Sequence, residues 1–460
     1  MTHQTPPSFG VPSLRIAIVG GGLSGLATLY ELSKHLERWA AWGTQIDITI
    51  FDPHGFDGRG VPYSPPRGKS PEVVEAWKKL TLTSKAEHML PGNEIANPEL
   101  DFYAWLRRQP NGRSYSASSH VPRYLFGDFL EEIAANLQAN IGAMPGVSLR
   151  IETAKISDAK SFMTDKQKIT LTTNGYDETF DQVFLATGHF RSQTLSELEG
   201  KPGYFRTVYH FDPAAMQPTK KGAHNLLIWG GENSIIDAIA MAEALGYRGK
   251  YTIVTHAADH LENRQENSQI KLPPTYSQFC RIRDHERGRI EILNGSVHDT
   301  AITAASGRNF NVPATIIYNG GTMEINLTAA NLVNAALWER GPTFSAGHAF
   351  DEANCSFSRV NSSCLCTDLM DNLTSHGLAY LDSRDGMIRP RSPSLDLVGS
   401  PLMIGRIDET DYKSQSALHS WKTAARAVGN FKTRIEERGL LHVSHALDLQ
   451  LHRRQELALF

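Results

Sequence analysis

Three glycines near the N-terminus have the spacing of a phosphate-binding turn. Gly20, Gly22 and Gly25 form G-x-G-x-x-G within the stretch LRIAIVGGGLSG. In this pattern the first glycine permits a tight turn, the second lets the backbone approach a pyrophosphate, and the third lets a helix pack closely on a strand. Asp52 ends the next apolar segment, IDITIFD, where a carboxylate can accept hydrogen bonds from a ribose hydroxyl. These residues predict a dinucleotide site.

The elements around these glycines have the order that such a site requires. Residues 16–19 are an apolar strand, and the run LATLYELSKHL predicts a helix that continues to about residue 42. A helix that begins at the glycines presents free N–H groups and a positive dipole end to phosphates. The alternative, a chance glycine-rich turn in an unrelated α/β protein, does not require this order.

A second unit with the same order begins near residue 225, in NLLIWGGENSIIDAIAMAEALGYRGKYTIVTHA. Gly230 takes the first glycine position, but Glu232 takes the second and Ile235 the third. A carboxylate opposes an approaching pyrophosphate by its charge and its bulk. Two interpretations stay open. In the first, Glu232 turns away and the phosphate donors are Gly231, Asn233 and Ser234. In the second, the unit is retained only for its fold.

Two other stretches point to the same cofactor region. In DQVFLATGH, Thr187 and Gly188 end an apolar strand, and small residues there allow the backbone to approach a ligand closely. The stretch GFDGRGVPYSPPRGKS, which contains Arg59, is too rich in glycine and proline for regular structure. We expect it to be a loop beside the cofactor, with a solvated surface loop as the alternative.

Composition limits the other possibilities. The 460 residues exceed the usual size of a single core, so two domains or one domain with a large insertion are expected. The net charge of -3 gives no reason to expect nucleic-acid or anionic-membrane binding. No apolar run reaches the roughly 18 residues that span a bilayer. Four unevenly spaced cysteines fit reduced thiols, and the N-terminus lacks a signal-peptide pattern, so we expect a cytoplasmic protein.

The predicted fold class is α/β, with two Rossmann-like dinucleotide-binding domains. Residues 14–215 and 376–437 would form the first domain, and residues 223–375 a second domain inserted between its two parts. Within the insert, residues 327–341 (LTAANLVNAALWERG) are expected to be helical. Residues 438–460 are expected to form a helical tail that docks or makes a dimer contact.

Taken together, these motifs resemble a known family. VGGGLSG, FDP, D-x-x-x-L-A-T-G-H over residues 181–189, the inserted second unit and G-R-I over residues 405–407 resemble class B flavin-dependent monooxygenases, particularly the N-hydroxylating branch. GRGVPYS and VPRYLFGDFL resemble a bacterial FAD/NAD(P)-binding protein family related to aspartate N-oxygenases. The order of the motifs is more specific than any one of them.

The resemblance implies a set of cofactor contacts. It implies that the first domain binds FAD and the inserted domain NADPH or NADH. It also places Asp408 at the start of a helix that points at the flavin ring. The implied FAD contacts are Gly20, Gly22, Gly25 and Asp52; Thr187 and Gly188 would lie at the hinge between the domains; Gly230, Gly231, Asn233 and Ser234 would face the nicotinamide cofactor.

The implied reaction is N-hydroxylation of a small amine or amino acid, in which NAD(P)H reduces FAD and O2 forms a hydroperoxyflavin. A homo-oligomer is possible. Arg59, Lys85 and Arg123 are candidates for holding a substrate carboxylate, because guanidinium groups bind carboxylates in a bidentate manner. Arg123 also lies in the first turn of a predicted helix, the unfavourable end of the dipole for a cation, which suggests an anionic partner, with a solvent-exposed arginine as the alternative.

Other functions remain open at this point. One is a flavin oxidase or reductase that does not use the second nucleotide site, and another is a non-catalytic flavin-binding sensor or scaffold. A disulfide reductase is disfavoured because the sequence has no C-x-x-C. No metal is expected, because Cys364, Cys366 and His376 have poor zinc spacing and His256 with His260 is an isolated pair.

Overall fold

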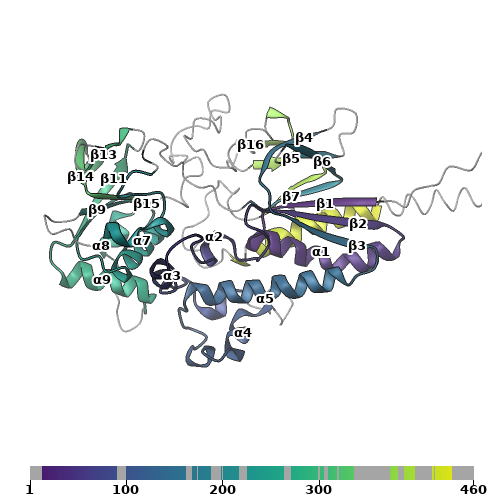
Figure 1. Cartoon of the computed structure of the whole chain (residues 1–460), viewed down its shortest axis with the longest axis horizontal. Helices are drawn as coiled ribbons and strands as arrows, with labels where there is room; N and C mark the ends of the chain where they lie inside the picture. The colour runs from purple at the N-terminus through teal and green to yellow at the C-terminus, as the bar shows by residue number, and fades with distance from the viewer. Residues whose placement is uncertain are drawn as a thin grey trace, which may run out of the picture.

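The chain folds into two α/β lobes that lie along its longest axis (Figure 1). The structure, a computed structural model, describes residues 13–90, 100–161, 168–173, 175–187, 198, 200–216, 225–263, 271–298, 301–304, 309–318, 321–335, 373, 375–381, 388–398, 417–418 and 420–437. None of the described helices is long and apolar enough to cross a membrane.

The first lobe is built on a five-stranded parallel sheet of order β18-β7-β1-β2-β3. Its central strands are buried on both faces, as expected for a parallel sheet that is covered on both sides. The strands are β1 (Ser13–Val19), β2 (Gln45–Phe51), β3 (Val147–Glu152), β7 (Gln182–Leu185) and β18 (Leu395–Leu397).

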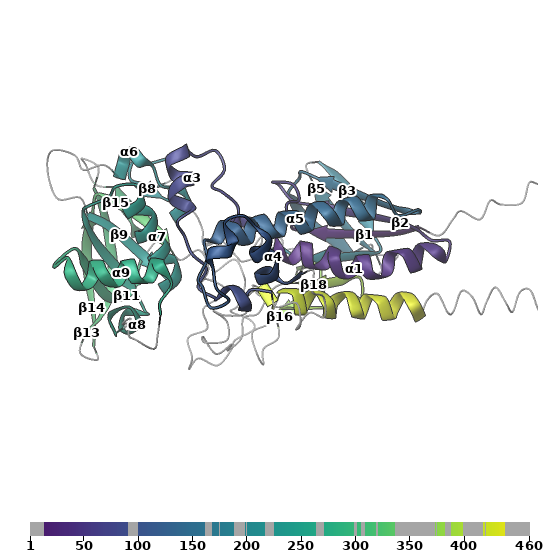
Figure 2. The same ribbon diagram turned by 90° about the horizontal axis from the view of Figure 1, so that it is seen from below.

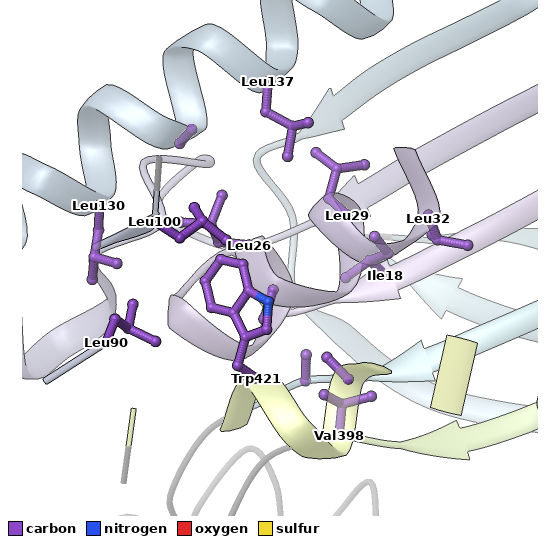
Figure 3. Packing of buried hydrophobic residues seen from close by; sticks show 14 of the residues in the cluster. Ile18, Leu26, Leu29, Leu32, Leu90, Leu100, Leu130, Leu137, Val398 and Trp421 are labelled. Atoms are coloured by element: carbon purple, nitrogen blue, oxygen red, sulfur yellow. The ribbon is translucent and has the colours of Figure 1, made fainter. Parts of the chain in front are cut away.

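One face of this sheet is covered by α1 (Leu23–Ala41), α5 (Arg123–Gly142) and a helix over residues 420–437. The last helix lies beside α1, as Figure 2 shows, and Figure 3 shows Trp421 packed near Leu26 and Val398. The indole of Trp421 also donates to Glu31 over 3.0 Å. The closing segment of the chain therefore returns to the first lobe.

The other face carries an antiparallel meander of β4 (Ile156–Ser161), β5 (Ile169–Thr173) and β6 (Tyr176–Phe180). Phe180 meets Phe51 edge to face, with ring centroids 5.8 Å apart. Smaller elements of this lobe are α2 (Gly60–Tyr63), η1 (Ala86–His88), α4 (Phe102–Arg108), η3 (Gly112–Ser114), β16 (Ala379–Leu381) and β17 (Ile388–Pro390).

The second lobe contains a parallel sheet of order β11-β10-β9-β15-β8, extended at β11 by antiparallel strands. Its strands are β8 (Tyr204–Phe205), β9 (Asn225–Gly230), β10 (Lys250–Thr255), β11 (Ile290–Val297), β12 (Thr303–Ala304), β13 (Phe310–Tyr318), β14 (Gly321–Ala329) and β15 (Asn331–Ala335). Its helices are η4 (Val208–His210), α6 (Pro213–Met216), α7 (Glu232–Ala244), α8 (Ala258–Asn263) and α9 (Pro274–His285).

The helix expected over residues 327–341 is wrong for the residues that the structure describes. Residues 331–335 form β15, which pairs between β9 and the edge strand β8 of the second sheet. A short apolar run such as LVNAA is compatible with a buried helix or a buried strand, and periodicity alone does not separate them. Residues 331–335 form a strand because they pair with β9 on one side and β8 on the other.

One helix crosses between the lobes. α3 (Pro71–Trp77) follows the first two strands of the first lobe in sequence, yet it lies beside the second lobe (Figure 2). Val73 and Trp77 are buried in the apolar core of the second lobe, which also contains residues of α7. The predicted α/β class with parallel sheets is confirmed. The domain boundaries proposed from the sequence stay predictions, and the tail over residues 438–460 lies outside the described residues.

Candidate functional site

The first glycine turn joins β1 to α1 in a conformation that only glycine adopts easily. Gly20 has φ of 113°, and its N–H donates to the Phe51 carbonyl over 2.8 Å. A Cβ at Gly20 would lie 2.2 Å from the Ala186 carbonyl oxygen, and a Cβ at Gly25 would lie 1.9 Å from the Gly20 carbonyl oxygen. The first and third glycines of the motif therefore serve the tight turn and the close packing of helix on strand.

The second glycine faces the irregular loop that follows β2. A Cβ at Gly22 would lie 3.1 Å from the Cα of Gly60. The same loop is fixed on the turn by the Gly58 N–H, which donates to the Gly21 carbonyl over 3.1 Å. The loop expected beside a cofactor is thus packed against the glycine turn, and α2 begins at Gly60.

Asp52 is part of the turn itself. One carboxylate oxygen accepts the Gly21 N–H over 2.7 Å, and the other accepts the His54 N–H over 2.8 Å. The side chain therefore fixes the glycine turn relative to the end of β2. Its contact with a ribose stays a prediction, and each oxygen still has a lone pair for a hydroxyl donor.

The third strand end meets the same turn. The Ala186 N–H, directly after β7, donates to the Val19 carbonyl over 2.8 Å. Thr187 follows it beside Gly20. Gly188, expected at the hinge between the domains, and Asp408, expected near the flavin, lie outside the described residues.

The second glycine turn joins β9 to α7. Gly230 has φ of 146°, Gly231 caps the helix, and Glu232 is its first residue. Glu232 is buried at 3% exposure, and Ser234 is also buried. Asn233 accepts a hydrogen bond from the Tyr276 hydroxyl of α9. The Glu232 carboxylate lies within the fold at the helix N-terminus, where the dipole favours a negative charge.

The three candidates for holding a substrate carboxylate lie in different surroundings. Arg59 forms ion pairs with Asp128, over 2.9 Å, and with Glu131, both on α5. Lys85 is exposed and precedes η1. Arg123 lines a small pocket of about 90 Å³ in the first lobe. Its lining residues are Pro62, Tyr63, Leu82, Thr83, Ser84, Met89 and Arg123.

Arg123 also reaches across to the second lobe. Its Nη2 lies 2.8 Å from the Asp237 carboxylate of α7, and its Nη1 donates to the Tyr209 hydroxyl over 3.2 Å. Burial alone would lower the pKa of Arg123. The neighbouring Asp237 carboxylate raises this pKa, and the net shift is upward, so the guanidinium stays protonated. Burial raises the pKa of Asp237 against the opposing effect of Arg123, and it raises the pKa of Tyr209 to about 12.

Asp237 and Tyr209 are not among the site residues that the sequence predicts. The position of Arg123 at a helix N-terminus had indicated an anionic partner, and the structure supplies one in Asp237. The signal available for Asp237 was an acidic residue on the otherwise apolar helix IIDAIAMA, one turn after Asn233. A charge buried on an apolar helix is rare unless it is paired.

The glycine cradle fits a dinucleotide. Side chains at Gly20 or Gly25 would collide with backbone atoms, and one at Gly22 would make a tight contact with the Cα of Gly60. Helix α1 begins at Leu23, directly after the turn. Among the described residues, no group of three or more His, Cys, Asp or Glu side chains could hold a metal ion. These features match a cofactor held by backbone N–H groups and a helix dipole.

A family of known cofactor-binding proteins matches the part of the chain that contains this glycine turn. Residues 17–190 match the FAD-NAD(P)-binding family, which covers the first glycine turn, Asp52, Arg123 and Thr187. No curated protein matches the chain. The predicted FAD/NAD(P)-binding domain, with FAD and NAD(P) as its cofactors, is confirmed at this level.

Solved structures share the whole fold at low sequence identity. The reduced form of ornithine hydroxylase from Pseudomonas aeruginosa is 11% identical with a TM-score of 0.55, over 91% of this chain and 100% of that chain. Ornithine N-hydroxylase from Kutzneria sp. 744, with reduced FAD, NADP+ and L-ornithine, is 11% identical with a TM-score of 0.55, over 92% and 100%. L-lysine 6-monooxygenase from Pseudomonas syringae is 12% identical with a TM-score of 0.52, over 90% and 99%. The chain therefore has the fold of FAD/NAD(P)-dependent oxidoreductases.

Proposed function

We propose that this protein is an FAD-dependent, NAD(P)H-using monooxygenase that N-hydroxylates a small amine or amino acid. The observation that carries the proposal is the position of Arg123. It lines a pocket beside Tyr63, close to the first glycine turn, and its guanidinium is bound to α7, the helix that begins at the second glycine turn. The fold shared with ornithine and lysine hydroxylases supports the same reading.

The first lobe would hold FAD. The backbone N–H groups at the start of α1 would bind the pyrophosphate, and Asp52 would keep the turn in place while accepting a ribose hydroxyl. When bound, FAD supplies the electron transfer from NAD(P)H to O2, chemistry that amino-acid side chains do not provide.

The pocket would bind and orient the substrate. Arg123 is charged and can offer N–H donors to a carboxylate, while Thr83 and Ser84 add hydroxyls to the lining. Leu82, Met89 and Pro62 make part of the wall apolar, which would keep water away from the reacting nitrogen. The volume of about 90 Å³ favours a small substrate.

The test is NAD(P)H oxidation by the purified, FAD-loaded protein with a panel of amines and amino acids. Substrate-dependent formation of a hydroxylamine or a further oxidised nitrogen product is expected, measured together with hydrogen peroxide so that uncoupled turnover is counted separately. A protein that binds no FAD, or that consumes no oxygen with any substrate, would contradict the proposal. The second of these outcomes would point to a flavin-binding sensor or scaffold.

Glu232 motivates a second candidate, a flavin oxidase or reductase that does not use the second nucleotide site. The buried carboxylate occupies the glycine position at which a pyrophosphate would approach. Anaerobic stopped-flow mixing separates the two. Rapid bleaching of the flavin by NADPH or NADH supports the monooxygenase, whereas no bleaching by either supports an oxidase reduced by its own substrate.

A further inference from the structure

The two lobes are joined by buried polar contacts beside the pocket. Arg123 begins α5 in the first lobe, and its partners Asp237 and Tyr209 belong to the second lobe. The hydroxyls of Thr81 and Thr275 meet over 3.1 Å and are also buried. Thr81 is bridged to Pro122, directly before Arg123, so both contacts act on the same short segment.

The ion pair is well placed to resist movement. The side chains of Arg123 and Asp237 are each only 11% exposed, and Nη2 lies within 3.1 Å of both carboxylate oxygens. A small shift of the lobes that lengthens this contact without admitting water would leave each buried charge without its partner, which is strongly unfavourable. A surface pair would not have this effect, because water replaces its partner at little cost.

Asp237 connects two parts of the proposed site. It lies one helical turn after Asn233 on α7, so it moves with the second glycine turn as one rigid element. Through Arg123 the same helix is bound to the pocket wall in the first lobe. The pair therefore limits movement of the second nucleotide unit relative to the pocket.

We propose that Asp237 is a positioning residue that, through Arg123, fixes the second nucleotide unit against the pocket of the first lobe in the arrangement that flavin reduction requires. The claim that the lobes are held together is supported directly by the Arg123–Asp237 and Thr81–Thr275 contacts. The effect on flavin reduction rests on the proposed function.

The first test measures the fixing of the lobes without using activity. Thr81→Cys and Thr275→Cys are introduced together, and the rate of disulfide formation under mild oxidation is measured by peptide mass spectrometry. The pair is compared in three backgrounds: unchanged, Asp237→Asn and Glu243→Gln. Glu243 is the matched control, because it is also on α7 and pairs through a largely buried carboxylate with Arg289, but within the second lobe.

We expect cross-linking to be about tenfold slower with Asp237→Asn and unchanged with Glu243→Gln, because only the first breaks the contact between lobes. Equal rates in all three backgrounds would overturn the proposal. If Asp237→Asn does not fold, the double variant Arg123→Met/Asp237→Ala leaves no unpaired buried charge, and its short alanine side chain makes no contact that replaces the ion pair. The same slow cross-linking is expected of it, and an unchanged rate would count equally against the proposal.

The second test asks whether fixing the lobes matters for flavin reduction. In the FAD-loaded Asp237→Asn variant, anaerobic reduction by NADPH should be about tenfold slower per bound flavin, while reduction by dithionite is unchanged. Oxidising the Thr81→Cys/Thr275→Cys pair in this variant should restore the NADPH rate. A purely structural role predicts an unchanged rate per bound flavin, which would overturn this part. If NADPH and NADH fail to reduce even the unchanged protein, the proposed function fails, and the cross-linking rates still decide the role of Asp237.

Discussion

The Asp52 carboxylate accepts the Gly21 N–H over 2.7 Å and thereby joins the end of β2 to the glycine turn that follows β1. Its second oxygen accepts the His54 N–H, so one side chain fixes both the turn and the start of the loop that packs on it. The residue expected to contact a cofactor also shapes the cradle.

Asp52→Ala should weaken FAD binding by roughly 10- to 100-fold, because hydrogen bonds to a charged group contribute about 1.5–3 kcal/mol. Asp52→Asn retains one acceptor oxygen and should have an intermediate effect. Fluorescence titration of the apoprotein with FAD measures both. An unchanged dissociation constant for Asp52→Ala would show that the turn keeps its shape without this side chain.

Gly25→Ala should destabilise the first lobe by about 3 kcal/mol or more, because the new Cβ would lie 1.9 Å from a backbone oxygen that cannot move freely. Gly142→Ala, at the end of α5, is the matched control. Its Cβ would meet nothing within 4 Å, and alanine is favoured over glycine in a helix by up to about 1 kcal/mol. Urea unfolding of the two variants should therefore shift in opposite directions.

Glu232→Gln should tighten NAD(P)H binding about tenfold if a pyrophosphate approaches the second turn, because it removes a like charge while keeping the side-chain size. The Michaelis constant for NADPH, measured at several salt concentrations, tests this. Weaker binding after the substitution would mean that the carboxylate helps to form the site. Glu243→Gln, on the same helix but paired with Arg289, should leave the constant unchanged.

Folding stability should fall on acidification through His120. Burial is the main reason that its pKa lies below the usual value of 6.5, and the Leu82 carbonyl, 3.2 Å from Nδ1, opposes that effect only in part. Because the folded state binds this proton less readily than the unfolded chain, the contribution is fully present above about pH 6.5 and is lost as the pH falls through the folded pKa.

His120→Gln should therefore reduce the difference in unfolding free energy between about pH 7.5 and pH 5, as measured by urea titration at each pH. His35 has a pKa lowered mainly by burial as well, so part of the pH dependence should remain in the variant. An identical pH profile for the variant and the unchanged protein would exclude a contribution from His120.

Arg59→Gln should lower stability by up to about 1 kcal/mol, because its partners Asp128 and Glu131 are more than a third exposed and solvent weakens the pairs. If Arg59 mainly holds the loop on α5, Arg59→Gln and Asp128→Asn together should cost less than the sum of the two single changes. If it holds a substrate carboxylate, as its residue type suggested, the Michaelis constant of the substrate should rise with little loss of stability.

The sequence by itself determined the local parts of this protein. Gly20, Gly22 and Gly25 could be assigned because each is required by steric contacts between the turn and its immediate neighbours. The order of strand, turn, helix and strand in both units was readable for a similar reason, since the period of apolar residues reflects each element's own burial. Both glycine turns lie where the spacing predicted them.

The tertiary structure decided what depends on residues far apart in sequence. It made residues 331–335 a strand by placing them between β9 and β8, and it moved α3 into the core of the second lobe. It also gave Arg123 its partner, Asp237, 114 positions away. Such pairings follow from the packing of whole lobes, because burial and charge compensation are satisfied by whichever groups the folded chain brings together, and a local pattern does not specify them.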